Sequence, residues 1–217
     1  MASFEDIKGK EKTSKSLTEL VVATSNCHKL REYRQVFIDF PKDLDICSLR
    51  NFSDYVSPEE TGETFEDNAL LKAQHAAKVL NTWVIADDSG LVVPALKGKP
   101  GVRSARYAGE KATDAQNRDK LMQEMISLSG NERSGYFVCC IALAHPDGFT
   151  KYFEGICEGE ILTEERGSNG FGYDSLFIKN SYTKTFAEME ESTKNRISHR
   201  RKALDKLFLY LETIVEK

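Results

Sequence analysis

Two adjacent carboxylates, in the sequence Asp87-Asp88-Ser89-Gly90, are candidate catalytic groups. The residues before them, Trp-Val-Ile-Ala at 83–86, are predicted to form a buried strand that stops at Asp87. Ligands of α/β sheets bind at the carboxyl ends of strands, and successive strand residues point to opposite faces, so the two acids should do different jobs. Carboxylate oxygens suit Mg²⁺, and a carboxylate can also deprotonate an attacking water. A plain Asx-type turn is the alternative reading.

A polar turn between a predicted strand and a predicted helix is a candidate phosphate-binding site. It covers residues 24–29, Thr-Ser-Asn-Cys-His-Lys. The free N–H groups of a first helical turn attract anions, and the hydroxyls and Lys29 add donors at the same place. The Walker A pattern is absent. The alternative is a helix entry that contains an asparagine, with a lysine on the surface.

Acidic and basic residues also flank a predicted helix that begins at a capping box over residues 64–67. Glu60 belongs to an acidic pair in the loop before this helix. Asn68 and Lys72 are four residues apart, so they share one face of the helix. Paired acids in a loop can equally serve only to solvate it.

A glycine-rich segment, residues 167–174 (Gly-Ser-Asn-Gly-Phe-Gly-Tyr-Asp), is a candidate base-binding loop. Its glycines would let the backbone approach a ligand closely, and Phe171 or Tyr173 could stack on a flat base. The glycine order is not that of a dinucleotide-binding fingerprint. A glycine-rich hairpin with an aromatic residue in the core is the alternative.

Basic residues crowd the start of the last predicted helix. Ser198 is a good N-cap, His199 and Arg200 follow it, and Lys194 precedes it by one turn. Cations at a helix N-terminus oppose the helix dipole by about 0.3–1 kcal/mol each, so this segment is either an indifferent surface or the site of a bound anion. Histidine and arginine can also donate to the acceptor oxygens of a base.

The elements that must position these residues alternate along the chain. Strands are predicted over residues 20–25, 44–49, 83–86, 91–96, 135–145 and 150–158, and helices over 29–39, 64–80, 113–128 and 199–215. Residues 51–62, 98–101 and 167–172 are predicted loops. A turn signal at 145–148 predicts that the last two strands pair as a hairpin. The pattern favours an α/β fold with a mixed sheet.

Length and composition fit one α/β domain, or one domain with a second small lobe. The chain has 217 residues, of which 40% are apolar and 29% charged, and a net charge of −4 that argues against a nucleic-acid partner. Its five cysteines are odd in number and contain no C-x-x-C pair, which argues against a disulfide framework or a structural zinc site. No segment reaches the ~18–20 apolar residues of a membrane span, so no membrane partner is expected. Residues 1–19 are predicted to be a flexible leader without a secretory signal.

Together and in order, these motifs resemble the inosine triphosphate pyrophosphatase family, most closely its bacterial-type members. The matching segments are VVATSNCHKLREY, EETGETFEDNALLKAQHAAK, IADDSGLVVPALKGKPGVRSARYAGE, RGSNGFGYDSLF and TFAEMEESTKNRISHRRKAL, from about Val21 to Leu204. Cys27 and His28 depart from the family pattern, in which small residues are common at these positions.

The resemblance implies an elongated, two-lobed α/β fold with a central mixed sheet flanked by helices and an active-site cleft between the lobes. Residues 20–217 would form a single domain. The resemblance further implies a cytoplasmic homodimer and an Mg²⁺-dependent nucleoside triphosphate diphosphatase. Such an enzyme converts XTP, ITP and dITP to the monophosphate and pyrophosphate, and so removes them from the nucleotide pool.

The resemblance also implies roles for individual residues. Glu60 and Asp88 would bind Mg²⁺, Asp88 would also be the base for water, and Lys72 would assist catalysis at the phosphates. The division of labour between Asp87 and Asp88 stays open. The residues implied in substrate binding are Thr24, Ser25, Asn26, Lys29, Ser89, Phe171, Gly172, Tyr173, Asp174, Lys194, His199 and Arg200.

The hydrogen-bond donors and acceptors on the edges of the bases indicate how the site could select among nucleotides. Hypoxanthine and xanthine present an O6 acceptor where adenine presents an N6 donor, so donors from His199 and Arg200 would favour the oxo bases. Guanine also has O6, and rejection of GTP needs a further feature that the sequence does not reveal. Three rival readings stay open: a pyrophosphatase for pyrimidine nucleotides, a nucleotide-binding module without turnover, and a nucleic-acid-binding protein that uses residues 194–202.

Overall fold

The structure, a computed structural model, describes residues 17–41 and 43–215. Most of the predicted leader, residues 1–16, lies outside the described residues. No helix in the described ranges combines the length and the apolar character that a membrane crossing needs.

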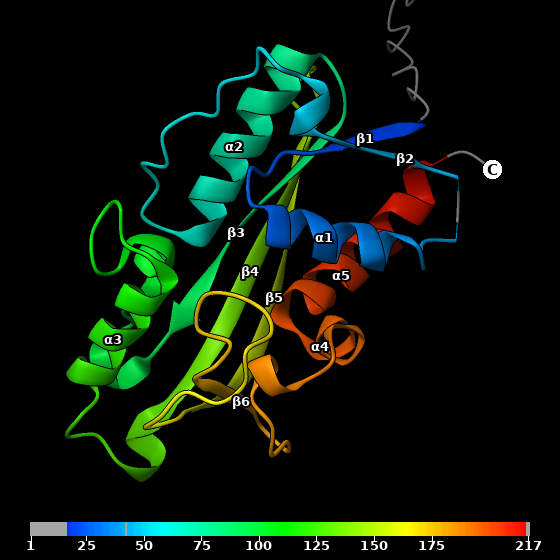
Figure 1. The fold of residues 1–217 in the computed structure, drawn as a ribbon. Coiled ribbons are helices and arrows are strands. Elements are labelled where there is room, and N and C mark those ends of the chain that lie inside the picture. The colour runs from blue at the N-terminus through cyan, green and yellow to red at the C-terminus, as the bar shows by residue number, and fades with distance from the viewer. Residues whose placement is uncertain (1–16, 42, 216–217) are drawn as a thin grey trace, which may run out of the picture.

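One mixed sheet forms the centre of the molecule, with its six strands in the order β2-β1-β3-β4-β5-β6 (Figure 1). β1 pairs in parallel with β2 and with β3, and the remaining neighbours are antiparallel. This arrangement confirms the predicted α/β class and the mixed sheet. The strands are β1 (Glu19–Val22), β2 (Asp45–Ser48), β3 (Val84–Val92), β4 (Ser134–Ala144), β5 (Thr150–Ile161) and β6 (Phe177–Lys179).

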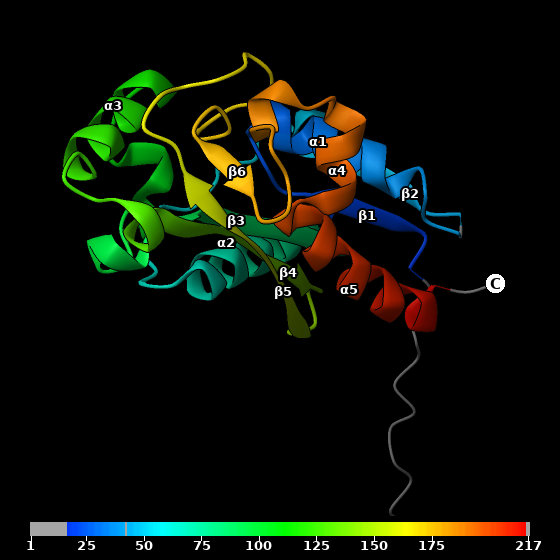
Figure 2. The ribbon, with the colours of Figure 1, turned by 90° about the horizontal axis from the view of Figure 1, so that it is seen from below.

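Helices connect and cover these strands. Within the described residues they are α1 (Cys27–Phe37), α2 (Phe65–Leu80), α3 (Asp114–Glu124), α4 (Glu191–Ile197) and α5 (His199–Ile214). Short 3₁₀ turns cover Leu49–Asn51, Pro94–Leu96, Gly101–Arg106, Gly130–Arg133 and Phe186–Glu188. The view in Figure 2 places α2 and α1 on opposite sides of the central strands.

Strand alternation decides which helix each side chain meets. Ile85, Ile141 and Leu143 belong to the core that α1 and α5 share, whereas their neighbours Val84 and Ala142 belong to the core under α2. The buried face of α2 is made largely of alanines, at positions 69, 73, 76 and 77. Small side chains let this helix lie close to the sheet, which brings its polar residues near β3.

A separate core lies beyond the far ends of β3, β4 and β5. It joins Leu91 of β3 and Phe137 of β4 to Leu121 of α3, Phe177 of β6 and Tyr173 of the glycine-rich segment. This second core fixes α3 and the glycine-rich segment to the same part of the molecule, so that both can border one site.

The structure corrects the prediction that a strand stops at Asp87. β3 runs unbroken from Val84 to Val92, and residues 94–96, predicted as part of a separate strand, form a 3₁₀ turn. β4 supplies an antiparallel partner along the whole length, from Ala144 opposite Val84 to Tyr136 opposite Val92. A continuous partner strand therefore overrides the polar Asp-Asp-Ser-Gly sequence.

Several short elements were not predicted. They are β6, α4 and the 3₁₀ segment Gly101–Arg106, of three, seven and six residues. Elements of this length carry too few residues for a periodic pattern to emerge. The longer predicted elements agree with the structure apart from shifts at their ends.

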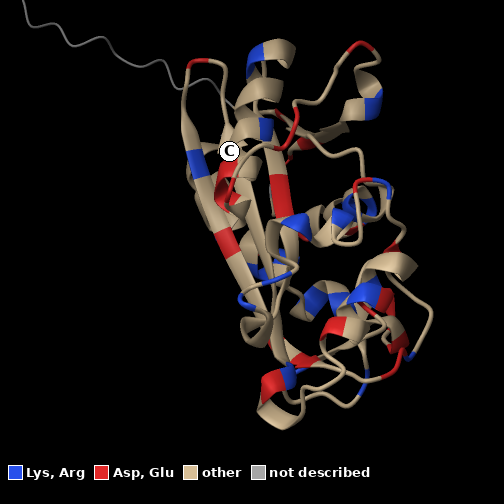
Figure 3. Cartoon of the chain, turned by 90° about the vertical axis from the view of Figure 1, so that its left-hand side faces the viewer, with Lys and Arg blue, Asp and Glu red and all other residues tan. Residues whose placement is uncertain are grey.

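Figure 3 colours the chain by residue type and shows Lys and Arg interspersed with Asp and Glu along the described residues. The chain as a whole has a net charge of −4. This charge balance disfavours a protein that coats nucleic acid.

Candidate active site

One cavity of about 320 Å³ lies where β1, β3, α2, the 3₁₀ segment Gly101–Arg106 and the glycine-rich segment meet. Every residue to which the family resemblance assigned a catalytic, metal-binding or substrate-binding role lines this cavity. The set comprises Thr24, Ser25, Asn26, Lys29, Glu60, Lys72, Asp88, Ser89, Phe171, Gly172, Tyr173, Asp174, Lys194, His199 and Arg200. Asp87 lines it as well.

The two adjacent acids of β3 face opposite sides of the sheet. β1 pairs only with Val84 and Ile85 of β3, so both acids lie just beyond the carboxyl end of the parallel neighbour strand. The two acids therefore do lie at a strand end, as expected, but the strand that ends beside them is β1 and not β3. Because the acids alternate, each meets a different set of partners.

Asp87 is buried among cations. Its Oδ2 lies 2.8 Å from Lys29 Nζ and 3.4 Å from an Arg200 guanidinium nitrogen, and it accepts a hydrogen bond from Ser89 Oγ at 3.2 Å. Burial opposes the ionised form, but Lys29 and Arg200 outweigh it and hold the pKa of Asp87 well below its ordinary value. Asp87 is therefore a permanent anion that anchors cations, and a poor proton acceptor.

Asp88 faces α2. Asn68 Nδ2 donates to its Oδ2 at 3.0 Å, and Lys72 Nζ lies 3.7 Å from its Oδ1. Burial raises the pKa of Asp88 above its ordinary value, although Lys72 and Lys29 oppose the shift. A carboxylate with a raised pKa accepts a proton more readily than an ordinary aspartate.

Glu60 lies in the loop before α2 and faces the same lysine. Lys72 Nζ donates to Glu60 Oε1 at 2.7 Å, and an Arg106 guanidinium nitrogen donates to Oε2 at 3.2 Å. Burial raises the pKa of Glu60, but Lys72 and Arg106 outweigh it and leave the pKa below its ordinary value. Glu60 is thus an anion under all ordinary conditions.

The donor set at this end suits Mg²⁺. One lysine nitrogen contacts both Glu60 and Asp88, so a small cation can lie within reach of both carboxylates. Mg²⁺ takes one or two carboxylates and completes its shell with waters and substrate phosphates. The described residues contain no group of three or more His, Cys, Asp or Glu that could hold a metal ion.

Several backbone N–H groups of the turn between β1 and α1 already donate hydrogen bonds to side chains of the same turn. Asn26 Oδ1 accepts from the backbone N–H groups of His28 at 2.9 Å and Lys29 at 3.1 Å, and Thr24 Oγ1 accepts from Asn26 N at 3.2 Å. Two N–H groups that the sequence analysis treated as free for an anion are therefore capped. The hydroxyls of Thr24 and Ser25 and the ammonium of Lys29 still line the cavity.

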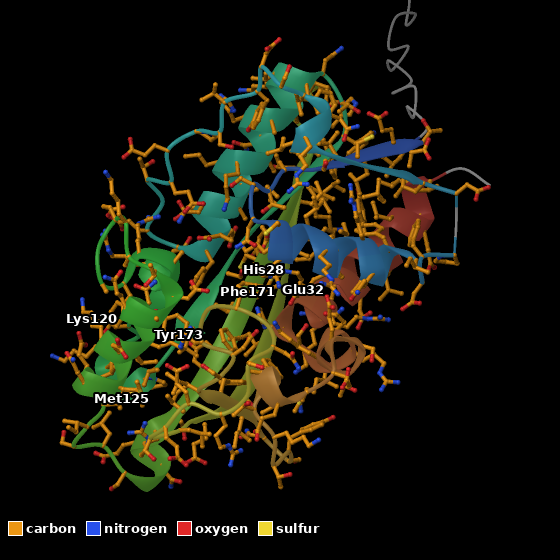
Figure 4. The ribbon with its side chains drawn as sticks, in the orientation of Figure 1. His28, Glu32, Lys120, Met125, Phe171 and Tyr173 are labelled. Carbon is orange, nitrogen blue, oxygen red and sulfur yellow. The ribbon has the colours of Figure 1, made fainter. Side chains whose placement is uncertain are left out.

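Phe171 lines the cavity from the glycine-rich segment. Its ring stacks on His28 with centroids 5.2 Å apart and an interplanar angle of 17° (Figure 4). Lys194 Nζ lies 4.7 Å from the centroid of the Phe171 ring. Asp174 fixes the loop by accepting from Phe171 N at 3.0 Å. Tyr173 is buried in the second core, and its hydroxyl donates to Ser104 O at 2.9 Å. Of the two candidate aromatics, Phe171 is the one placed to stack on a ligand.

His199 is buried beside Phe137, with ring centroids 4.8 Å apart. Burial lowers the pKa of His199 well below its ordinary value, and Arg200 and Lys194 reinforce the shift. The imidazole is therefore neutral at physiological pH. Among the described residues its Nδ1 has no hydrogen-bond partner, which leaves a polar atom available to a ligand in the cavity.

A buried chain of charges connects β3 to the glycine-rich segment. Glu32 binds Arg200 and accepts from Lys194 at 2.9 Å, and Lys194 also donates to Asp174 at 2.6 Å. Arg200 continues the chain by donating to Ser89 Oγ at 3.0 Å. Lys194 and Arg200 are therefore not surface cations, which was one of the two readings of the basic cluster.

Two further residues, Glu32 and Arg106, were not predicted from the sequence. Glu32 lies on the buried face of α1 with Tyr33 and Val36, and its partners, Lys194 and Arg200, are distant in the sequence. Arg106 gave no signal, because it belongs to a 3₁₀ segment that has no periodic pattern.

Comparisons with known proteins give a consistent result. The sequence model of the Ham1 family matches residues 20–210. A "dITP/XTP pyrophosphatase" of Protochlamydia amoebophila is 56% identical over 197 residues, which is 90% of this chain and 98% of that protein. A protein of the same name from Chlamydia abortus is 52% identical over 202 residues, with 92% and 97% covered.

Solved structures agree. A HAM1 protein from Coxiella burnetii superposes with a TM-score of 0.82 at 41% identity, covering 90% of this chain and 98% of that one. The Ham1 protein of Staphylococcus aureus superposes with a TM-score of 0.78 at 43% identity, with the same coverage.

Proposed function

The chain belongs to the Ham1 family, and from this premise we propose that it is a nucleoside triphosphate diphosphatase that cleaves dITP, XTP and ITP to the monophosphate and pyrophosphate. The observation that carries the proposal is the cluster of Glu60, Lys72 and Asp88 beside the polar turn 24–29, in a chain 56% identical to a dITP/XTP pyrophosphatase. Removal of deaminated purine nucleotides from the nucleotide pool follows from that activity.

We propose Mg²⁺ as the cofactor, held by Glu60 and Asp88. The ion, when bound, would neutralise phosphate charge, as phosphoryl transfer requires. The support is the pair of carboxylates that share Lys72, at 2.7 and 3.7 Å. Lys72 is then free to turn from Glu60 toward the phosphates, while the hydroxyls of the turn after β1 and Lys29 at the start of α1 approach them from the other element.

Asp88 is the proposed base. Its carboxylate would take a proton from the attacking water, a role that its raised pKa supports. Asn68 Nδ2 holds one carboxylate oxygen at 3.0 Å and so fixes the orientation of the acid. Asp87 is left with an organising role, since its pKa is depressed and its partners are Lys29 and Arg200.

The base of the nucleotide is proposed to stack on Phe171, with His199 as its polar contact. A neutral imidazole with an unpartnered Nδ1 can donate to the O6 acceptor that hypoxanthine and xanthine share. Arg200 is occupied by Glu32, Asp87 and Ser89, so its contribution is to fix these groups more than to read the base. Lys194 and Asp174 position Phe171 through the loop.

Further features of the proposal concern the molecule as a whole. Residues 20–217 would form one domain whose two lobes meet at the cavity, and two copies would form a homodimer, as the family resemblance implies. A cytoplasmic location fits the five cysteines, all of which are free thiols.

Pyrophosphate release from a panel of dITP, XTP, ITP, dATP, GTP, CTP and UTP tests the function. We expect strong release from the first three only, with Mg²⁺ present, and none in EDTA. Equal release from CTP or UTP would contradict the proposed base selection, and the absence of any release would contradict the enzyme itself.

A further inference from the structure

Arg106 brings an additional cation to the end of the cavity where Glu60 lies. It is the last residue of the 3₁₀ segment Gly101–Arg106, and its side chain lines the same cavity as Lys29 and Lys72. One guanidinium nitrogen lies 3.2 Å from Glu60 Oε2, and Nε lies 3.7 Å from Glu110 Oε2. Arg106 thus lies beside one of the two carboxylates proposed for Mg²⁺.

The backbone that carries Arg106 is fixed from two sides. Ser104 Oγ accepts from Leu91 N at 2.9 Å, and Asn117 Nδ2 donates to Ala105 O at 3.0 Å. Gly90 permits this close approach of the segment to β3, because a Cβ atom there would lie only 2.3 Å from Ser104 Oγ. A cation on a fixed backbone is placed before any ligand arrives, which lowers the entropy cost of binding.

The ion pairs of Arg106 are partly exposed, so Arg106 can exchange its present partners for a ligand. Its ion pairs in the described part of the chain go to side chains that are 30% exposed (Glu60) and 70% exposed (Glu110). A divalent ion on Glu60 would compete with Arg106 for the same carboxylate. The released guanidinium is a planar fork that matches two phosphate oxygens at once.

The contacts among these groups indicate which phosphates Arg106 would meet. Phe171 is the proposed stacking partner of the base, Asp88 is the proposed base for the attacking water, and Lys72 links Asp88 to Glu60 at 3.7 and 2.7 Å. Arg106 pairs with Glu60, so in this chain of contacts it lies one step beyond Lys72 from Asp88. The part of the substrate that extends past Asp88 is the part that leaves as pyrophosphate.

We propose that Arg106 is a substrate-binding residue that contacts the pyrophosphate portion of the triphosphate. The inference rests on the function proposed above, since that function supplies the triphosphate. It adds a specific contact for the leaving product.

Binding of each product to matched variants tests the proposal. Titration calorimetry with Mg²⁺ would measure the affinities of inorganic pyrophosphate and of IMP for the wild type, Arg106→Gln and Arg103→Gln. Arg103 is the matched control, because it lies on the same 3₁₀ segment and pairs with the same Glu110 at 2.6 Å, yet it does not line the cavity. We expect Arg106→Gln to bind pyrophosphate about tenfold more weakly, as for the loss of a charge-assisted hydrogen bond, and IMP within twofold of the wild type. Arg103→Gln should match the wild type for both.

Unchanged pyrophosphate affinity in Arg106→Gln would overturn the proposal, as would an equal loss of IMP affinity or a wild type that does not bind pyrophosphate. If Arg106→Gln fails to fold, Arg106→Lys replaces it: the charge stays, the fork is lost, and an intermediate affinity is expected, with wild-type affinity overturning the proposal. A wild type that binds pyrophosphate through Arg106 but releases none from dITP would leave this contact standing and refute the proposed function.

Discussion

Asp87 and Asp88 show how two identical side chains in sequence come to differ in chemistry. Strand alternation turns Asp87 toward Lys29 and Arg200, and Asp88 toward Asn68 and Lys72. The first set lowers the pKa of Asp87, whereas burial dominates at Asp88 and raises its pKa. This difference in environment supports the proposal that Asp88, and not Asp87, acts as the base.

Replacement of Asp88 by asparagine should abolish turnover and leave the fold intact. We expect kcat for dITP to fall by about 10²–10⁴-fold, because a general base is lost. The thermal midpoint should stay level or rise, because the raised pKa of Asp88 means that the folded protein disfavours the charged form. Pyrophosphate release and thermal unfolding measure the two effects. Asp119→Asn, at an exposed position of α3, is the control; retained activity in Asp88→Asn would refute the assignment.

Candidate site residues that belong to a recognisable motif could be predicted from the sequence, whereas residues outside any motif could not. Asp88, Lys72 and His199 were found because a polar residue beside an apolar run or a helix cap is conspicuous. Glu32 was missed because an acid in an amphipathic helix reads as solvent-facing, although here it is 6% exposed and binds Lys194 and Arg200. The charge of Glu32 can be buried because Lys194 and Arg200 pair with it. These partners lie 162 or more positions away in the sequence, so no local pattern predicts the burial.

At the scale of elements, β3 shows the limit of local propensity. The Asp-Asp-Ser-Gly sequence reads as a strand end, yet antiparallel pairing with β4 carries the strand through it to Val92. The long elements were predictable because helix α2 and strand β4 repeat their pattern over many residues. The 3₁₀ segment that carries Arg106 has a conformation set by contacts with β3 and α3, so only the tertiary structure could reveal it.

The glycine-rich segment is the element whose shape most directly sets the base end of the cavity. Gly170 has φ +77°, and a Cβ atom there would lie 2.1 Å from Asp174 Oδ2. Asp174 also binds Phe171 N and Lys194 Nζ, at 3.0 and 2.6 Å. A side chain at position 170 would therefore displace the residue that holds the loop.

Gly170→Ala should accordingly impair binding as well as stability. We expect the KM for dITP to rise roughly tenfold, because a small displacement of a positioning group is costly, and the free energy of unfolding to fall by about 1–3 kcal/mol. Gly148→Ala is the matched control: its φ is +98°, but the space around it is open, so only backbone strain is expected. Steady-state kinetics and denaturant unfolding separate the effects. Equal KM values for the two variants would show that Asp174 does not transmit the change.

At the scale of the whole molecule, buried charges tie the α1–α5 core to the second core. Glu32 of α1 binds Arg200 of α5, and Lys194 of α4 joins Glu32 to Asp174. Breaking a buried pair leaves an uncompensated charge, which is strongly destabilising. The stability of the fold and the geometry of the site are thus set by the same groups, and the buried His199 beside them adds a dependence on pH.

His199 gives this dependence a defined sign. Its pKa in the folded protein is well below the ordinary 6.5, owing to burial, Arg200 and Lys194, so the unfolded chain binds a proton near pH 6.5 that the folded chain refuses. Its contribution to stability is therefore full above pH 6.5 and is lost as the pH falls below that value, by at most about 1.4 kcal/mol per pH unit. For a chain of this length, that limit corresponds to a fall in the thermal midpoint of at most about 3–6 °C per pH unit between pH 6.5 and 5. His199→Gln, which cannot take up that proton, should flatten the slope in this window, whereas His75→Gln, on α2 and away from the cavity, should leave it unchanged. Thermal unfolding from pH 8 to 5 measures all three proteins. The same slope in His199→Gln as in the wild type would show that His199 is not the group that makes the folded protein sensitive to acid.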